Sequence, residues 1–195
     1  MELTVSRATP LERTLLGNLM QLYLYDFAEF DDREPDADGR FEYRWLDEYW
    51  DDEDRYPYVL RNRGGHAIGF ALVRRMDTVL RMDAVRRTPT VRRMDTVRGG
   101  HDGERAGAAA DASPPARQEG PSFEMAEFFI LRGYRGRGFG TAAARRILRE
   151  HPGEWRITEV ERNAPAISFW RSVLPVAYIE HVLDDGTHEQ RFRID

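Results

Sequence analysis

The stretch Arg135-Gly136-Arg137-Gly138-Phe139-Gly140 decides the fold of this 195-residue chain. An apolar, strand-like run at residues 125–131 precedes it, and helix-like residues 141–148 follow it. The three glycines allow positive φ angles and let a ligand approach the backbone closely. Because the first turn of a helix carries unpaired N–H groups and partial positive charge, this unit predicts a site for an anion such as a phosphate. A solvated basic loop is the alternative interpretation.

The composition indicates one globular domain covering residues 1–195, with 41% hydrophobic residues and a formal net charge of -5. There is no cysteine, which excludes disulfide scaffolds, thiolate zinc sites and a cysteine nucleophile. All basic residues are arginine, so lysine Schiff-base chemistry is excluded as well. No apolar leader or membrane-length apolar run is present, and we expect a cytoplasmic protein with no membrane partner.

Apolar spacing and turn residues predict the remaining elements. We expect strands at residues 2–8, 56–61, 67–74, 155–161, 176–183 and 187–193, besides the one before the glycine-rich turn. Helices are expected from Leu11 to about Tyr25, over residues 41–50 and 139–150, and from Asn163 onward.

Residues 26–54 are strongly acidic and contain the aromatic residues of the second expected helix. One interpretation is a solvated loop whose aromatic helix face packs on the core. The other is a cleft of acids and aromatics that recruits a cationic amine.

Residues 75–121 change character: a hexapeptide of the type Arg-Met-Asp-Thr-Val-Leu occurs four times, and an Ala/Pro/Ser-rich tract follows. We interpret this segment as a disordered, repeat-containing insertion between the third and fourth strands. A small β-helix and a basic arm for nucleic acid are the other two interpretations. The alternation of Asp with Arg dilutes the positive charge, so we expect no nucleic-acid partner.

Two motifs carry a resemblance to a known family. Residues 135–140 match the pyrophosphate motif [Q/R]-x-x-G-x-[G/A], and residues 163–170 match an Asn followed by A-x-x-[FL]-[YW]. With this order of elements, the chain resembles the GCN5-related N-acetyltransferase (GNAT) superfamily. Residues 18–23, 49–50 and 125–129 are similar to those of a little-characterised branch of predicted acetyltransferases. The resemblance implies an α+β (α/β) GNAT fold: a mixed, mostly antiparallel sheet of six to seven strands with about four helices.

The resemblance also implies acetyl-CoA as co-substrate, lying in an opening between the fourth and fifth strands. The backbone of Phe129, Ile130 and Leu131 is expected to hydrogen-bond the pantetheine arm like an added strand. The amides of the turn are expected to hold the pyrophosphate, and Asn163 the pantetheine or thiol end. This cofactor-binding turn comprises Arg135, Gly136, Arg137, Gly138, Phe139, Gly140 and Thr141.

An amine must be neutral to attack a thioester, and a free alkylamine has a pKa near ~10. A proton acceptor is therefore needed, and Glu124 and Glu127 on the fourth strand are the candidates. Because they are an odd number of residues apart, they are expected to face opposite sides of the sheet. Glu159 and Glu161 on the next strand are reserves.

At the position where many family members have a tyrosine that protonates the leaving thiolate stands Trp170, which cannot do so. We expect Trp170 to pack in the core, with Tyr134, water or no acid serving the thiolate. The five histidines show no metal-ligand spacing, so no metal is expected.

The resulting hypothesis is an N-acetyltransferase that transfers acetyl from acetyl-CoA to a primary amine, preferably a small cationic one, by direct attack in a ternary complex. A protein N-terminus or lysine is the alternative acceptor, and a non-catalytic acyl-CoA-binding module is the alternative function. A homodimer is compatible with the resemblance.

Overall fold

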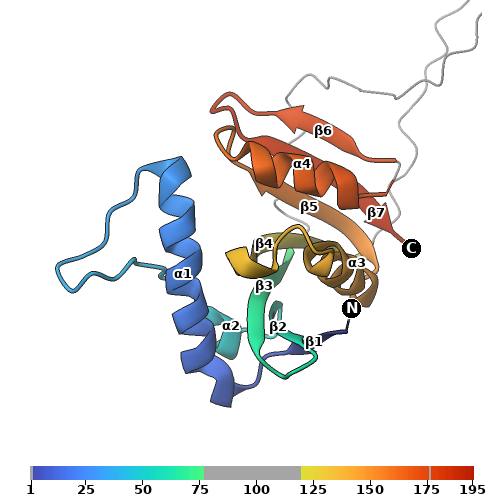
Figure 1. The fold of residues 1–195 in the computed structure, drawn as a ribbon. Helices are drawn as coiled ribbons and strands as arrows, with labels where there is room; N and C mark the ends of the chain where they lie inside the picture. Colours follow the sequence, from blue (N-terminus) through green and yellow to red (C-terminus); the bar gives the residue numbers. More distant parts are fainter. Residues whose placement is uncertain (1, 77–119, 176) are drawn as a thin grey trace, which may run out of the picture.

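The computed structural model describes residues 2–76, 120–175 and 177–195. One seven-stranded sheet carries helices on both faces: α1 and α2 on one face, α3 and α4 on the other (Figure 1). In chain order the elements are β1 (Leu3–Arg7), α1 (Arg13–Asp31), α2 (Glu48–Asp51), β2 (Arg55–Asn62), β3 (Ala67–Met76), β4 (Ser122–Ile130), α3 (Phe139–Glu150), β5 (Gly153–Glu159), α4 (Ala164–Val173), β6 (Ile179–Val182) and β7 (His188–Ile194). This matches the predicted fold class.

The strand order is β1-β2-β3-β4-β5-β7-β6, and all neighbours are antiparallel except β4 and β5. The parallel ladder joins Ser122–Met125 to Glu154–Ile157 and then stops, although β4 continues to Ile130. The two strands therefore separate in their second halves, and the sheet is open between them.

Two apolar clusters hold the helices against the sheet. On the α3/α4 face, Ile147 and Trp170 belong to the same buried cluster as Trp155, which itself stacks on Phe192. On the other face, buried leucines of α1 pack on Phe70 and its neighbours in β2 and β3. Each fully buried side chain of this size stabilises the fold by about 1.5–3 kcal/mol, so both helices are fixed relative to the strand opening.

The first two helices differ from the sequence prediction. Helix α1 runs on to Asp31 and ends at Asp32, which takes a left-handed φ of 57°. The expected helix over residues 41–50 is reduced to α2. The reason is that Gln21 of α1 binds the backbone of Phe41 through both amide atoms, at 2.8 and 2.9 Å, which holds the start of this segment out of a helix.

The expected insertion begins later than predicted, because Arg75 and Met76 belong to β3. Met76 lies directly opposite Ser122 of β4, so the two strands are already paired where the insertion leaves and returns. The repeats fall in residues 77–119, outside the described residues, and their interpretation stays a prediction.

A β-bulge in β4 changes which side chains face the same way. Leu72 pairs with Glu127 and Val73 with Met125, so Ala126 is an extra residue on β4. Arg74 pairs with Glu124. Since paired residues share a face and alternate residues of β3 do too, both glutamates lie on the α1 face. The expectation that they face opposite sides is wrong, because the bulge shifts the alternation by one.

Candidate active site

The opening between β4 and β5 leaves one edge of β4 without a strand partner beyond Met125. The Leu131 N–H donates to the Ile68 carbonyl on β3, at 2.8 Å. Because N–H groups alternate along a strand, the backbone of Phe129 also faces β3, and that of Ile130 faces the opening. Of the three residues predicted to bind a pantetheine arm, Ile130 is therefore the one whose N–H is oriented for it.

The glycine-rich turn forms the start of α3, as predicted. Gly136 and Gly138 have φ angles of 68° and 80°, which disfavour other residues, and Gly138 is the N-cap residue. At Gly140, a Cβ would lie 3.2 Å from the Phe169 ring, so glycine allows α3 and α4 to pack closely. The first amides of α3 have no carbonyl partners within the helix, and this arrangement fits a pyrophosphate.

The two arginines of the turn differ in their surroundings. Arg135 donates to the Ile130 carbonyl at 2.7 Å and to Asp26 of α1 at 2.5 Å. Arg132, just before the turn, donates to the same Asp26 carboxylate at 2.8 Å. Arg137 is exposed in the turn. Arg135 thus ties the turn to α1, and Arg137 is the side chain placed to add charge to the backbone amides.

Asn163 is the N-cap of α4, and its Oδ1 accepts a hydrogen bond from the Ala166 N–H at 3.2 Å. Its side-chain oxygen is therefore used within the helix. The Nδ2 group and the second lone pair of Oδ1 are left for the predicted contact with a cofactor.

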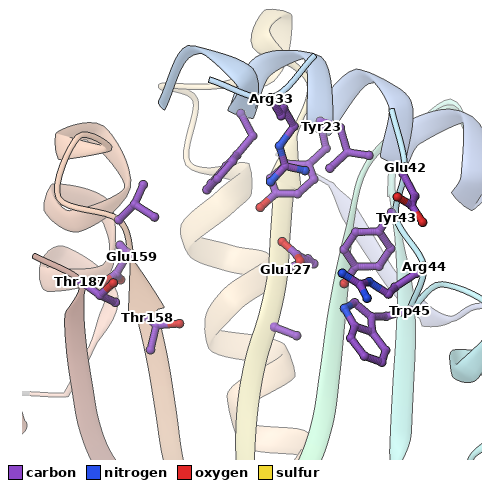
Figure 2. Close-up of a pocket in the computed structure, with 14 residues that line it drawn as sticks. Tyr23, Arg33, Glu42, Tyr43, Arg44, Trp45, Glu127, Thr158, Glu159 and Thr187 are labelled. Atoms are coloured by element: carbon purple, nitrogen blue, oxygen red, sulfur yellow. The ribbon is translucent and has the colours of Figure 1, made fainter. Parts of the chain in front are cut away.

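A cavity of about 500 Å³ lies at the strand opening, next to α1 (Figure 2). Its walls come from α1, the segment before α2, and the diverging ends of β4 and β5. The lining residues are Tyr23, Leu24, Phe27, Arg33, Glu42, Tyr43, Arg44, Trp45, Ala126, Glu127, Thr158, Glu159, Val160 and Thr187.

Glu127 projects into this cavity, with the Tyr23 and Tyr43 side chains next to it (Figure 2). Burial raises the pKa of Glu127, and hydrogen bonds from the two tyrosine hydroxyls hold part of that rise back. Burial also keeps the pKa of both phenols well above 10, so they remain hydrogen-bond donors. Glu127 is thus a carboxylate of reduced acidity, held in place by neutral donors.

Glu124 occupies a different environment although it shares the face of Glu127. It is 4% exposed and pairs with Arg74 and, at 2.6 Å, with Arg156. It does not line the cavity. Of the two predicted proton acceptors, only Glu127 reaches the space a substrate could enter.

Glu159 is 6% exposed, and neither of its carboxyl oxygens has a hydrogen-bond partner within the described part of the chain. Burial, with a contribution from Glu180, raises the pKa of Glu159 to about 8. Glu161, the other reserve candidate, is exposed beyond the end of β5. The structure therefore brings Glu127 and Glu159 to one cavity.

Tyr23 and Tyr43 were not among the predicted site residues. Tyr23 is spaced like the core residues of α1, and nothing in the sequence around it indicates that its hydroxyl contacts Glu127 of β4. Trp170 is buried in the core beside Phe128, as expected. Tyr134, a candidate acid, accepts a hydrogen bond from the Asn62 amide at 3.2 Å and is not among the cavity residues.

Among the described residues, no group of three or more His, Cys, Asp or Glu is arranged to hold a metal ion. No helix in the same part of the chain is long and apolar enough to cross a membrane.

Solved structures with this fold include three acetyltransferases. An acetyltransferase of the GNAT family from Streptococcus agalactiae has a TM-score of 0.61 and 15% identity, covering 99% of this chain and 95% of that one. A spermidine N-acetyltransferase from Vibrio cholerae, in complex with CoA and spermine, has a TM-score of 0.58 and 11% identity over 98% and 95%. The ribosomal-protein-S18-alanine N-acetyltransferase from Escherichia coli has a TM-score of 0.56 and 12% identity over 100% and 95%.

A search of curated proteins found no match to this sequence. The model of the acetyltransferase (GNAT) family, in contrast, matches residues 19–174, which include the strand opening, the glycine-rich turn and Glu127. The chain therefore belongs to the GNAT family and is an acetyl-CoA-dependent N-acetyltransferase.

Proposed function

We propose that the protein transfers the acetyl group of acetyl-CoA to the primary amine of a small cationic molecule, by direct attack in a ternary complex. The observation that carries the proposal is the cavity at the strand opening, where Glu127 and Glu159 meet a wall of aromatic side chains. The chain has no cysteine that could carry the acetyl group as a thioester, which favours direct attack.

The donor side rests on two features of the backbone. The first amides of α3, after Gly138, would hold the pyrophosphate, with Arg137 beside them. The open edge of β4 at Ile130 would bind the pantetheine arm. When bound, acetyl-CoA supplies the activated acetyl group, and this chain aligns it with the cavity.

On the acceptor side, an ammonium group is attracted by the carboxylate of Glu127 in the cavity. Before attack it must lose a proton. Glu127 would take that proton, because it lies in the cavity and burial raises the pKa of its carboxyl group. Tyr23 and Tyr43 would orient the carboxylate toward the amine.

The solved structures with the same fold support an amine acceptor, but their own acceptors differ in size. The Vibrio cholerae protein was crystallised with CoA and spermine, a small cationic amine. The Escherichia coli protein is named for a ribosomal protein. A peptide N-terminus or lysine is therefore the second candidate acceptor for this chain.

The test is release of CoA from acetyl-CoA with a panel of small amines, polyamines and short peptides. We expect turnover with small cationic amines, and a loss of about 10²- to 10⁴-fold in kcat in Glu127→Gln. Glu154→Gln, which removes a carboxylate at the far end of β5, is the matched control and should keep the wild-type rate.

Binding of acetyl-CoA, measured as the thermal stabilisation that it causes, should be the same in the wild type, Glu127→Gln and Glu154→Gln. Stabilisation without turnover on any amine of the panel would refute the proposed acceptor class. Turnover on peptides alone would establish the protein acceptor.

A further inference from the structure

Glu159 is a buried carboxyl group that the proposed function leaves unused. Its side chain is 6% exposed and both its oxygens are unpartnered within the described residues. Buried polar groups almost always have a hydrogen-bond partner, and exceptions cluster where a ligand or a catalytic step supplies one. A ligand in the cavity that Glu159 lines is the natural candidate.

The place of Glu159 in the sheet is informative. It lies two residues beyond Ile157, the last β5 residue paired with β4. Strand alternation puts Glu159 on the same face as Ile157, which packs in the cluster under α3 and α4. Glu127 projects from the opposite face, toward α1. The two carboxyl groups therefore flank the strand opening from its two sides.

The charged groups around Glu159 do not neutralise it. Its partner across the β5–β7 ladder is His188, whose Nδ1 lies 2.9 Å from Glu180 of β6. Arg171 of α4 binds the same Glu180 at 2.5 Å. Arg171, the cation of this cluster, and the His188 ring are thus both engaged by Glu180, whose own charge opposes ionisation of Glu159. Because of burial and Glu180, the pKa of Glu159 is about 8, and its carboxyl group is mostly protonated at neutral pH.

The thioester end of the donor should come close to this group. With the pyrophosphate at the start of α3, the pantetheine arm must run along the open edge of β4 from Ile130 back to Ala126. That stretch of strand spans roughly 13 Å and ends where β4 and β5 meet. The sulfur would then lie at the apex of the opening, where Glu159 lines the cavity.

We propose that Glu159 is the proton donor to the sulfur of CoA as the thiol leaves. This inference rests on the proposed function. As the carbon–sulfur bond breaks, its electron pair stays on sulfur, and the carboxyl proton of Glu159 moves to it. Glu127 first takes one proton from the ammonium group, and the neutral nitrogen then forms the bond to the acetyl carbon. The second proton, which that nitrogen loses once it is bonded to the carbon, returns through solvent to the Glu159 carboxylate. For each acetyl group transferred, the reaction therefore forms one amide and one thiol and releases one proton.

The environments of the two carboxyl groups agree with this division. Tyr23 and Tyr43 donate hydrogen bonds that favour the carboxylate of Glu127, whereas Glu159 has no donor and faces the charge of Glu180. Paired carboxyl groups with such opposed surroundings divide into base and acid. The acidity of Glu159 also lies close to that of a thiol, whose pKa is about 8.5, so the proton can move either way.

The first test needs no turnover. The infrared difference spectrum between the wild type and Glu159→Gln should show the carbonyl band of a protonated carboxyl group at pH 7, lost as the pH rises through about 8. Binding of CoA should shift this band. Desulfo-CoA, which lacks only the sulfur, should leave it unshifted. A missing band at pH 7, or the same shift with both ligands, overturns the proposal.

The second test is kinetic. Glu159→Gln should lower kcat with the best amine by about 100-fold, leave the binding of acetyl-CoA unchanged and abolish the fall in kcat at alkaline pH. Glu154→Gln should behave as the wild type. An active enzyme whose Glu159→Gln variant keeps the full rate refutes the donor role alone. A CoA-specific infrared shift in a protein that acetylates no amine supports the place of Glu159 at the sulfur and refutes the proposed function.

Discussion

Replacing Tyr23 with phenylalanine should move the acidic limb of the pH–rate profile toward higher pH. The hydroxyl of Tyr23 donates to the carboxylate of Glu127 and so favours its charged form. The ring is held in place by Phe70 and Phe129, with centroid distances of 5.8 Å to each. Tyr23→Phe therefore removes the hydrogen bond and keeps the packing.

The size of the shift follows from the strength of one hydrogen bond. A bond to a charged group contributes about 1.5–3 kcal/mol, and one pKa unit corresponds to about 1.4 kcal/mol. Because Glu127 is partly open to the cavity, the lower end applies, which gives a rise of about one unit. The base must be ionised to act, so kcat/KM at a pH below the limb should fall about tenfold, while the plateau should hardly change.

The measurement is kcat/KM against pH for the best amine, in the wild type, Tyr23→Phe and Tyr25→Phe. Tyr25 lies on the same helix, is 67% exposed and should give the wild-type profile. A limb that stays in place, or moves to lower pH, would show that Glu127 is not the group titrating in the free enzyme.

Three further outcomes test other parts of the structure. Gly138→Glu should abolish stabilisation by CoA, because it puts a carboxylate and a disfavoured φ where the phosphates would bind; Gly133→Glu, in open space, should not. A two-residue turn in place of residues 77–119 should preserve the melting temperature and the affinity for acetyl-CoA; loss of either contradicts the interpretation of this segment as an insertion. Burial lowers the pKa of His151, so its contribution to stability is present above about pH 6.5 and lost as the pH falls; thermal melts should show a flatter acid profile in His151→Gln, and an unchanged one would refute this.

The elements built from local signals could be predicted from the sequence. Helix α3 runs from Phe139 to Glu150 as expected, because its glycine start and its His-Pro-Gly end are both coded nearby. Asn163 caps α4 for the same reason. The family assignment followed from these two motifs and is confirmed by the family match.

The parts that depend on distant contacts could not be predicted. The segment after Phe41 stays outside a helix because of Gln21, twenty positions earlier. The shared face of Glu124 and Glu127 depends on a bulge that appears only when β4 is paired with β3. Sequence reasoning named Glu127 as a candidate, but only the packing of α1 shows that tyrosines surround it.

The same limit applies to the two carboxylates of β4 and β5. In the sequence, Glu124 and Glu159 are both charged residues within strands. The fold gives Glu124 two arginine partners and gives Glu159 none within residues 2–76, 120–175 and 177–195. The difference arises from neighbouring strands and from α4, so it has no local signature.

The extra residue at Ala126 constrains how the length of this strand can vary during evolution. Alanine at this position has no polar contact to lose, so many substitutions there should be tolerated. Loss of the residue altogether is another matter, because it would turn one half of β4 over relative to the other. Either Phe123 and Met125 would turn out of the apolar cluster under α3 and α4, or Glu127 would turn into that cluster. Lineages of this protein should therefore keep the number of residues between Ser122 and Ile130 fixed, even where the residue at position 126 changes.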